Sequence, residues 1–501
     1  MLNIQKQLST SFLILLSLPT TAVGFCLSAG VASMSWILST RYGLKIDDIA
    51  LIWLMGPLFG LIVQPIVGWL SDRTWLWNSR RKPYLVAGGL AGAAALVALL
   101  KMDVIAELTG LSIFAIAIMV AVVSDLSINV TFNPARSLVA DVTPEGPDRT
   151  RGYSWMQTVS GTFGISAYLI SITLGNVALV WASAVIMALF SIAPLFFIEE
   201  PAPLEKPVGP EQFKQKQTSD LSAFKSLLPM SGFLVFGTFV AIDKLALENG
   251  MAGLYVPLFL VVIAVTLIWG AAVVWQGNAN PTPENRVRKI LLGHGFAWLG
   301  IQSMFVMAFF FVHDFVLPTT SSDTSIASTF MRLLSGSSPS SVDTAGNILS
   351  LGFLLMNLVG AILPVTVLDP LCLRWGRVMV HRSAIGSMVL GYLLVSYGAS
   401  GELFYYAGML LCGIGWASTI SIVFAIYTES VDPEKMGLNM SIFNCSLVLP
   451  ALAVPGLLKL STELGGGRWM FMLFALCLAV SFAFWCMVTE RKTPGKASHV
   501  G

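Results

Sequence analysis

Four polar residues lie at regular spacing in the apolar stretch over residues 111–142, namely Asp125, Asn129, Asn133 and Arg136. Helical periodicity places them along one side of a helix, and we name them the polar stripe. The two charged groups are then about 16 Å apart along the helix axis. An aspartate in a low-dielectric cavity can exchange a proton near neutral pH, whereas a permanent salt bridge keeps it ionised. The stripe therefore predicts an aqueous pathway in which Asp125 couples proton movement to transport.

A second interpretation of the stripe is structural. Asp125 could be held permanently by an arginine or by backbone N–H groups and serve only to fix helix packing. A charge at the centre of a bilayer costs about 2.5–3.5 kcal/mol on insertion scales, and ionisable residues kept there are usually functional. Pro134 also favours function, because it lacks an N–H and kinks the helix.

The composition is that of a membrane protein. Of 501 residues, 55% are hydrophobic and 11% are charged, against about 25% charged in soluble proteins. Apolar runs of about 20 residues recur from end to end, which predicts an all-α polytopic membrane protein. The expected spans number fourteen: 11–39, 49–70, 84–101, 110–138, 153–176, 178–198, 227–246, 252–276, 289–317, 346–368, 381–399, 403–428, 437–458 and 467–488.

Charge distribution predicts the orientation. If both termini are cytoplasmic, most of the 29 lysines and arginines lie on the inner side, as the positive-inside rule requires. The net charge of +2 includes no long basic block, which argues against nucleic acid as a partner. The first apolar run is too long for a signal-peptide core, so we expect it to be retained as a span.

Two loops indicate an internal repeat. SDRTWLWNSRRKPY follows the second span and LDPLCLRWGRVMVHR follows a later one. Each has an aspartate leaving one helix and arginines entering the next. Charges that pair in one conformation and separate in another suit alternating access. The predicted cytoplasmic gate comprises Asp72, Arg73, Arg80, Arg81, Asp369 and Arg377. The alternative is that the basic residues only set topology, which does not explain Asp72.

Other intramembrane polar groups are weaker candidates. Gln64, Asp314, Ser421 and Asn444 could hydrogen-bond a polyhydroxylated ligand, or could join helices at about 0.6 kcal/mol each. His313 next to Asp314 suggests a solvated pair near a helix end. The six cysteines lack paired spacing, so neither disulfides nor a metal site is expected. No phosphate loop, zinc helix or nucleophile elbow is present, and we predict neither an enzyme nor a cofactor.

The residues also resemble a known family. WLMGPLFGLIVQPIVGWLSDRTWLWNSRRKPY and SDLSINVTFNPARSLVAD are similar to the second and fourth spans of the sucrose transporter branch of the major facilitator superfamily, among the glycoside-pentoside-hexuronide:cation symporters. GIGWASTISIVFA and GLNMSIFNCSLVLP resemble its tenth and eleventh helices. The resemblance implies two six-helix halves, Asp125 as the proton-coupling residue and Arg136 as its partner or a substrate contact. Asn444 and Pro450 also match, with Ser79 where the family usually has glycine.

The chain departs from that family in two places. Its first span lacks the expected aromatic and glutamine pattern, and FVHDFVLP retains only Asp314 of an Asp–Trp motif. A polar, proline-bearing linker and an extra helix pair are expected to separate the halves. The expected domains are therefore an N-terminal half at 1–200, a linker with two added helices at 201–285, and a C-terminal half at 286–501.

Together these observations predict a proton-coupled symporter of a sucrose-like or maltose-like sugar or glycoside in the plasma (inner) membrane. Its partners would be the sugar, the coupling cation and the lipid bilayer. The alternative is a membrane assembly or pigment-delivery factor of the same superfamily. A cavity walled mainly by aromatic and aliphatic groups would favour that alternative.

Overall fold

The structure is a computed structural model that describes residues 3–44, 52, 60, 63–201, 223–246, 250–279, 281–320, 325–335, 341–397 and 401–490. The elements over these residues are helices, apart from one isolated bridge between Leu76 and Ser79. The predicted all-α class is confirmed. The chain forms two compact units, residues 1–220 with 431–444, and residues 221–430 with 445–501. The domain boundaries expected at 200 and 285 stay a prediction.

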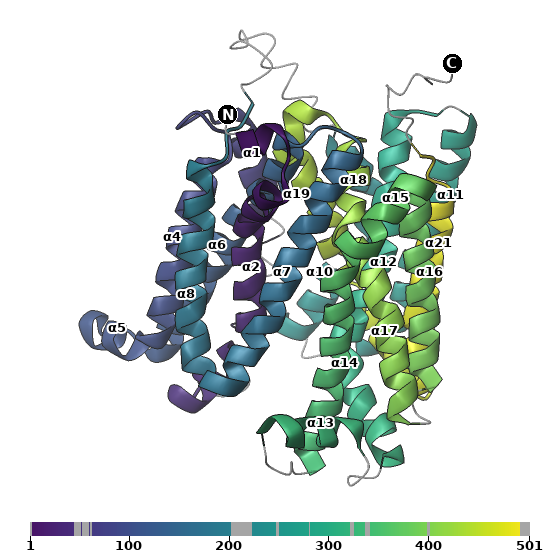
Figure 1. Cartoon of the computed structure of the whole chain (residues 1–501). Coiled ribbons are helices and arrows are strands. Elements are labelled where there is room, and N and C mark those ends of the chain that lie inside the picture. The colour runs from purple at the N-terminus through teal and green to yellow at the C-terminus, as the bar shows by residue number, and fades with distance from the viewer. Residues whose placement is uncertain are drawn as a thin grey trace, which may run out of the picture. The chain divides into compact units, whose positions relative to one another are not determined.

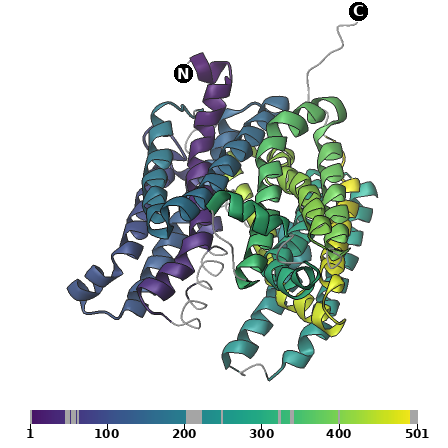
Figure 2. The same cartoon turned by 60° about the horizontal axis from the view of Figure 1, so that its bottom comes forward.

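The first unit is a bundle in which α2 packs on α6, α7 and α8, and α4 packs on α6 and α8. Both cartoon views show these helices side by side (Figure 1, Figure 2). The bounds are α1 (Asn3–Lys6), α2 (Thr10–Trp36), α4 (Lys82–Leu100), α5 (Met102–Thr109), α6 (Ile113–Val142), α7 (Pro147–Leu174) and α8 (Asn176–Ile192). A further helix occupies residues 63–73, and α19 (Met436–Ala451) begins in this unit.

The second unit contains the remaining helices. Here α16 packs on α17 and α21, α12 packs on α21, and α11 packs on α12 and α20. The bounds are α10 (Ser231–Ala246), α11 (Tyr255–Ala279), α12 (Pro283–Phe311), α13 (Ile326–Ser335), α14 (Ser341–Leu363), α15 (Asp369–Trp375), α16 (Arg377–Ser396), α17 (Glu402–Thr419), α18 (Ile422–Thr428), α20 (Val454–Glu463) and α21 (Arg468–Cys486).

Twelve helical segments among the described residues are long and apolar enough to cross a bilayer. They include the expected extra pair, Phe224–Asp243 and Ala252–Ala279. The span expected at 153–176 is helical as part of α7, although it is not among the twelve. Most of the span expected at 49–70 lies outside the described residues, so the total of fourteen stays a prediction.

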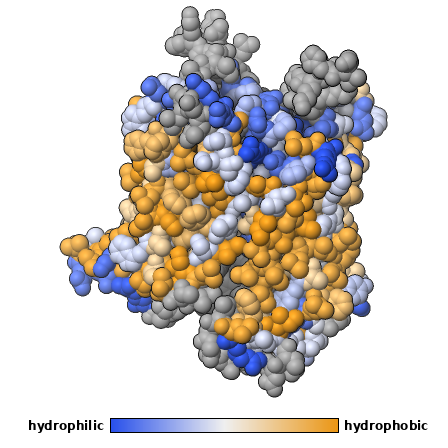
Figure 3. Space-filling model, viewed as in Figure 1, coloured by the Kyte–Doolittle hydropathy of each residue, from blue (hydrophilic) through white to orange (hydrophobic). Residues whose placement is uncertain are grey.

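The outer faces of the first unit's helices are apolar. Leu90 on α4 and Val185 and Leu189 on α8 are each about half exposed. In Figure 3 hydrophobic residues cover most of the visible surface along these helices, and hydrophilic residues gather near their upper ends. Exposed aliphatic side chains at this density suit contact with lipid tails.

Helix α6 carries the polar stripe and is positioned by its own sequence. Ser112 begins it, because its hydroxyl accepts a hydrogen bond from the Ala115 N–H at 3.2 Å, which satisfies one of the free donors of the first turn. The hydroxyls of Ser127 and Thr131 bond back to carbonyls one turn earlier, at 2.6 and 2.8 Å. These bonds let polar side chains lie inside the bundle without unpaired hydroxyl donors.

Close approach of α4 fixes the position of α6. A Cβ atom added at Gly88 would lie 2.1 Å from the Thr131 Oγ1 and 2.9 Å from the Ser127 carbonyl oxygen. Only glycine fits there, as is common where membrane helices approach closely.

We therefore predict that Gly88→Leu moves α4 away from α6 and destabilises the protein by about 1–3 kcal/mol, the usual cost of overpacking. The measurement is the thermal unfolding midpoint in detergent. Gly24→Ala is the matched control, because a Cβ there meets only Ser160 at 3.8 Å. Equal midpoints for the two variants would contradict this account of the contact.

Candidate functional site

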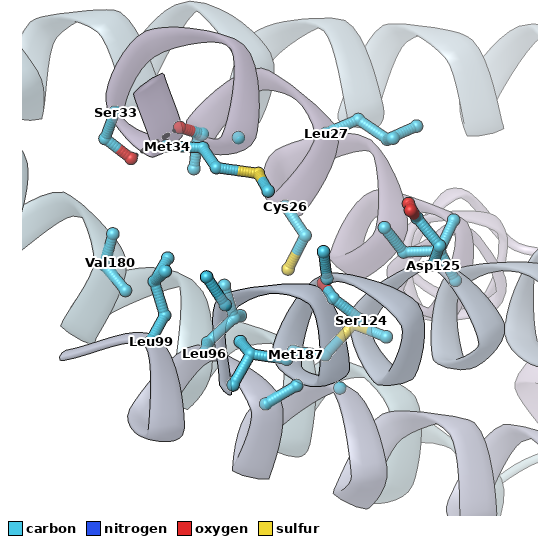
Figure 4. A pocket seen from close by; sticks show the side chains of 18 residues that line it. Cys26, Leu27, Ser33, Met34, Leu96, Leu99, Ser124, Asp125, Val180 and Met187 are labelled. Carbon is cyan, nitrogen blue, oxygen red and sulfur yellow. Dashed lines mark hydrogen bonds between the residues drawn. The ribbon is translucent and has the colours of Figure 1, made fainter. Parts of the chain in front are cut away.

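Asp125 borders a cavity in the first unit. The cavity has a volume of about 130 Å³ and lies among α2, α4, α6 and α8. Its wall is mostly aliphatic, with Ser33 and Ser124 as the other polar side chains. Figure 4 shows Asp125 at one end of the cavity and Ser33 and Val180 toward the other. The Asp125 side chain is partly buried, and among the described residues no cation or hydrogen-bond donor pairs with its carboxylate.

Four of the predicted site residues meet in one hydrogen-bonded cluster beside Asp125. The Gln64 side-chain amide donates to the Asn129 Oδ1, and the Gln64 Oε1 accepts from Asn133 (3.4 Å) and from Asn444. Asn133 also donates to the Ser441 Oγ at 3.1 Å. We name these five residues the amide network. All five are buried, and their mutual bonds offset the cost of removing amides from water.

The network connects to Asp125 and leaves one acceptor open. The Asn129 Nδ2 donates to the Asp125 backbone carbonyl at 2.8 Å. The Asn133 Oδ1 is buried and has no hydrogen-bond partner among the described residues. An unpaired buried acceptor costs about 1–3 kcal/mol. A ligand hydroxyl or a water bound at Asn133 would remove that cost.

Arg136 lies at the other end of the polar stripe and does not form an ion pair with Asp125. Its guanidinium carbon lies 3.6 Å from the centroid of the Phe132 ring, a cation–π contact. Its backbone carbonyl accepts a hydrogen bond from the Tyr153 hydroxyl at 3.1 Å. The structural interpretation of the stripe, in which Asp125 is permanently paired, has no support among the described residues.

Two other candidates lie in the second unit. Asp314 is half exposed and pairs with His313, with 2.7 Å between the Nδ1 and the Oδ1, so the expected solvated pair is confirmed. The Ser421 hydroxyl donates within its own segment, to the Ala417 carbonyl at 2.5 Å. Neither residue is part of the amide network.

The predicted gate residue Asp72 is joined to the start of α19. Its two carboxylate oxygens accept hydrogen bonds from the N–H groups of Gly437 and Leu438, each at 2.8 Å. These are free donors of the first helical turn, where a negative charge is favourable. The Arg81 Nη1 lies 2.8 Å from the same carboxylate. A Cβ at Gly437 would lie 2.5 Å from the Gly68 carbonyl oxygen, so glycine allows this close approach.

Arg81 is the centre of a buried charge cluster. Its Nε lies 2.8 Å from the Asp141 Oδ2, and the Arg80 Nη2 lies 3.2 Å from the other oxygen of that carboxylate. Burial acts to lower the pKa of the Arg81 guanidinium, but Asp141 and Asp72 outweigh it and raise that pKa. Arg81 therefore stays charged. Arg73 lies apart from this cluster, with its guanidinium carbon 4.0 Å from the centroid of the Trp69 ring.

The turn before α4 presents two backbone donors to Glu200. Its carboxylate accepts from the N–H groups of Arg80 (2.8 Å) and Arg81 (3.3 Å) and from the Ser79 hydroxyl. The Ser79 Oγ in turn accepts from the N–H groups of Arg81 (3.0 Å) and Lys82 (2.8 Å). Serine at this position, in place of the usual glycine, therefore satisfies free donors at the start of α4. The cluster of Asp72, Arg80, Arg81, Asp141 and Glu200 is named the first charge cluster.

The second unit repeats this arrangement around Arg377. Its guanidinium pairs with Glu429, and its Nε lies 3.5 Å from the Glu490 Oε1. The Val378 N–H donates to Glu490 at 2.8 Å, just as the N–H groups beside Arg81 donate to Glu200. We name Arg377, Glu429 and Glu490 the second charge cluster. Asp369 is the first residue of α15.

Sequence reasoning missed four acidic residues of these clusters, namely Asp141, Glu200, Glu429 and Glu490. The sequence separations between these acids and their partners are similar in the two clusters. Arg81 precedes Asp141 by 60 residues and Arg377 precedes Glu429 by 52. The donor to Glu200 precedes it by 119 residues and the donor to Glu490 by 112. The separations in the two units differ by seven or eight residues, so the sequence repeat indicates the general region of each acid but not its position.

Comparison with known proteins identifies the family. The model of the Major Facilitator Superfamily matches residues 16–364. The chain belongs to this superfamily. The fold agrees, since the E. coli fucose:proton symporter has a TM-score of 0.62 at 12% identity, with 96% of this chain and 99% of that chain covered. The human organic anion transporter MFSD10 has a TM-score of 0.59 at 15% identity, over 97% and 100%.

Curated relatives of this superfamily member match it over shorter stretches. The rice (Oryza sativa subsp. indica) sucrose transport protein SUT2 is 40% identical over 114 residues, which cover 20% of this chain and 23% of that protein. The general alpha-glucoside permease of Schizosaccharomyces pombe is 25% identical over 180 residues, 32% and 31% of the two chains. The chain thus spans about a quarter to a third of the length of these two relatives. The predicted resemblance to the sucrose transporter branch is confirmed.

The first charge cluster gives a stability prediction. Arg81→Met leaves Asp72 and Asp141 buried without this cation, which costs about 3–5 kcal/mol for a buried pair. We expect a lower thermal unfolding midpoint in detergent, and partial recovery when Asp141→Asn is added. Arg374→Met, at an exposed arginine of α15, is the matched control and should change stability by no more than about 0.5 kcal/mol. Equal losses in the two single variants would contradict the assignment.

Proposed function

We propose that this superfamily member is a proton-coupled symporter that moves a sugar or glycoside across the plasma (inner) membrane by alternating access, with both termini cytoplasmic. One observation carries the proposal. The Asp125 carboxylate lies inside a membrane span, at the edge of a cavity, without a cation beside it among the described residues. A carboxylate in that setting is free to take up and release a proton.

The amide network supports a polyhydroxylated substrate. Sugar hydroxyls both donate and accept hydrogen bonds, and amide side chains offer both functions in one group. Gln64, Asn129, Asn133 and Asn444 would contact substrate in this proposal, with the open Asn133 Oδ1 accepting a hydroxyl hydrogen. Arg136 would act as the ion-pair partner of Asp125 or contact the substrate in another state. Asp314 stays a predicted substrate contact.

The curated relatives support the same substrate class. Two of them are named sucrose transport proteins, SUT2 of rice and SUC4 of Arabidopsis thaliana, and a third is a general alpha-glucoside permease. The substrates given in all three names are glycosides. The proton as coupling ion rests on Asp125 rather than on these names.

The two charge clusters support alternating access. In this proposal the cytoplasmic gate includes Asp72, Arg73, Arg80, Arg81, Asp369 and Arg377, and the ion pairs hold helix ends together in one conformation. Each cluster joins several helices through short charged contacts, so it is either assembled or separated. Such bistable contacts are how small changes at a binding site become large movements.

A second candidate function has one observation in its favour. The wall of the cavity beside Asp125 is mostly aliphatic, which suits an apolar ligand better than a sugar. That matches a membrane assembly or pigment-delivery factor. The hydrogen-bonding capacity needed for sugar lies instead in the amide network, and a transport assay separates the two candidates.

The decisive experiment is uptake of labelled sucrose and maltose into proteoliposomes with an imposed inward proton gradient. One pH unit corresponds to about 1.4 kcal/mol, or accumulation up to about tenfold for one proton per sugar. We expect Asp125→Asn to abolish accumulation above equilibrium, because it removes the group that carries the proton. The exposed Asp103 on α5 provides the matched control, Asp103→Asn. Accumulation that survives in Asp125→Asn would disprove the coupling role. No uptake of either sugar by wild type would favour the assembly-factor candidate.

Arg136→Lys tests the other end of the polar stripe. Lysine keeps the charge but loses the planar group that stacks on Phe132 and can bind two acceptors at once. We expect uptake to fall at least tenfold while the protein remains folded, with the initial rate of uptake as the measurement. If the rate is unchanged, Arg136 acts only through its charge or only sets topology.

A further inference from the structure

A second cavity lies in the other unit, far along the chain from the polar stripe. It has a volume of about 620 Å³ and is lined by residues of α11, α12, α19 and α20. The lining residues are Tyr255, Gln302, Val306, Met307, Ala451, Val454, Pro455, Leu458, Lys459 and Thr462. We name this cavity the lateral cavity. It is several times larger than the roughly 150 Å³ cavity that accommodates benzene in an engineered protein. A single water or a metal ion would not fill it.

A break between α19 and α20 makes room for the lateral cavity. Helix α19 contains Pro450 and ends at Ala451, and α20 begins at Val454 with Pro455 next. Proline has no N–H to donate and interrupts regular helical bonding. Regular helical bonding is therefore interrupted at this point, and side chains on either side of the break line the cavity.

The extra helix pair contributes Tyr255 to the wall of the lateral cavity. The Tyr255 hydroxyl donates to the Asp243 Oδ2 at 2.8 Å, and the Met251 N–H donates to the Oδ1 of the same carboxylate at 2.8 Å. A Cβ at Gly456 would lie 2.6 Å from the Phe259 Cβ. Helix α11 is therefore in tight contact with α20, and the Tyr255 ring is held in place.

Three of the polar residues that line the lateral cavity, Tyr255, Lys459 and Thr462, lie near helix ends. Tyr255 is the first residue of α11, and Lys459 and Thr462 lie in the second half of α20, which ends at Glu463. Tyrosine and lysine at such positions are typical of the membrane–water boundary. Lys459 is exposed and is the charged residue of the lining. Among the described residues no carboxylate pairs with its ammonium group.

We propose that the lateral cavity binds an anionic phospholipid of the surrounding bilayer. Its phosphate lies at Lys459, where the side-chain amide of Gln302 offers a further hydrogen bond, and an acyl chain lies along Val306, Val454 and Leu458. The occupant must carry both an apolar part and a negative group, because the wall is mainly aliphatic and its one charge is positive. A sugar would leave most of its hydroxyls facing aliphatic groups. This inference goes beyond the transport function and does not depend on it.

Native mass spectrometry of the full chain tests the proposal. The protein is purified in detergent and supplied with equal amounts of phosphatidylglycerol and phosphatidylcholine that have the same acyl chains. We expect wild type to carry about fivefold more phosphatidylglycerol than phosphatidylcholine, the preference that one surface lysine gives. Lys459→Gln should equalise the two lipids and retain phosphatidylcholine at its wild-type level.

Two further variants complete the test. Lys101→Gln, at another exposed lysine, should keep the wild-type preference, which distinguishes a site from general surface charge. Ala451→Phe fills the cavity and should reduce both lipid adducts. Equal binding of the two lipids to wild type, or an unchanged preference in Lys459→Gln, would overturn the proposal. An altered monomer–dimer ratio in Ala451→Phe with unchanged lipid adducts would instead make this face an interface between two copies of the chain.

Discussion

The absence of water in the bilayer core is the constraint on which this structure depends. Every polar group inside the membrane needs a partner in the protein or in a ligand, because unpaired groups cost several kcal/mol there. Ser127 and Thr131 meet that requirement within α6, and the amide network meets it between helices. Several polar atoms of the described residues nevertheless have no hydrogen-bond partner, and two polar groups without a partner belong to the candidate site. The Asp125 carboxylate and the Asn133 Oδ1 lack partners among the described residues, and they are neighbours through Asn129 and Gln64.

The same constraint explains where the charges are. Buried ion pairs offset the free-energy cost of their desolvation only when their geometry is good and further hydrogen bonds satisfy the remaining donors and acceptors. Both charge clusters satisfy this condition at helix ends. The first has two arginines and three acids, the second has one arginine and two acids, and backbone N–H groups donate to an acid in each. In the first cluster Arg81 pairs with Asp72, which itself accepts from the start of α19. Losing one of these contacts leaves the remaining buried charged groups without a partner. We therefore expect each cluster to assemble or separate as a unit.

The sequence predicted features that depend on neighbours along one helix. Periodicity placed Asp125, Asn129 and Asn133 on one face, and apolar runs predicted helices such as α10 and α11. Periodicity and composition do not predict which distant segments of the chain come into contact. Gln64 was selected only as an intramembrane polar group, and Asn444 on that basis and on the family resemblance. Their meeting with Asn133 depends on how three helices pack. Asp141 and Glu200 were overlooked because an acid near a helix end also looks like ordinary solvated charge, and only the fold shows it beside an arginine.

In the proposed symport, coupling would have a physical basis in the two different environments near Asp125. On one side is an aliphatic cavity, which tolerates a neutral carboxyl and penalises a carboxylate. On the other side is the amide network, which can donate hydrogen bonds to a carboxylate or to a bound hydroxyl. Gain or loss of a proton therefore changes which environment the side chain prefers. Since Asn129 bonds to the Asp125 backbone and to Gln64, a shift in that preference changes the hydrogen bonds available to a sugar at the same network. Proton and substrate would thus be linked through shared partners, without direct contact between them.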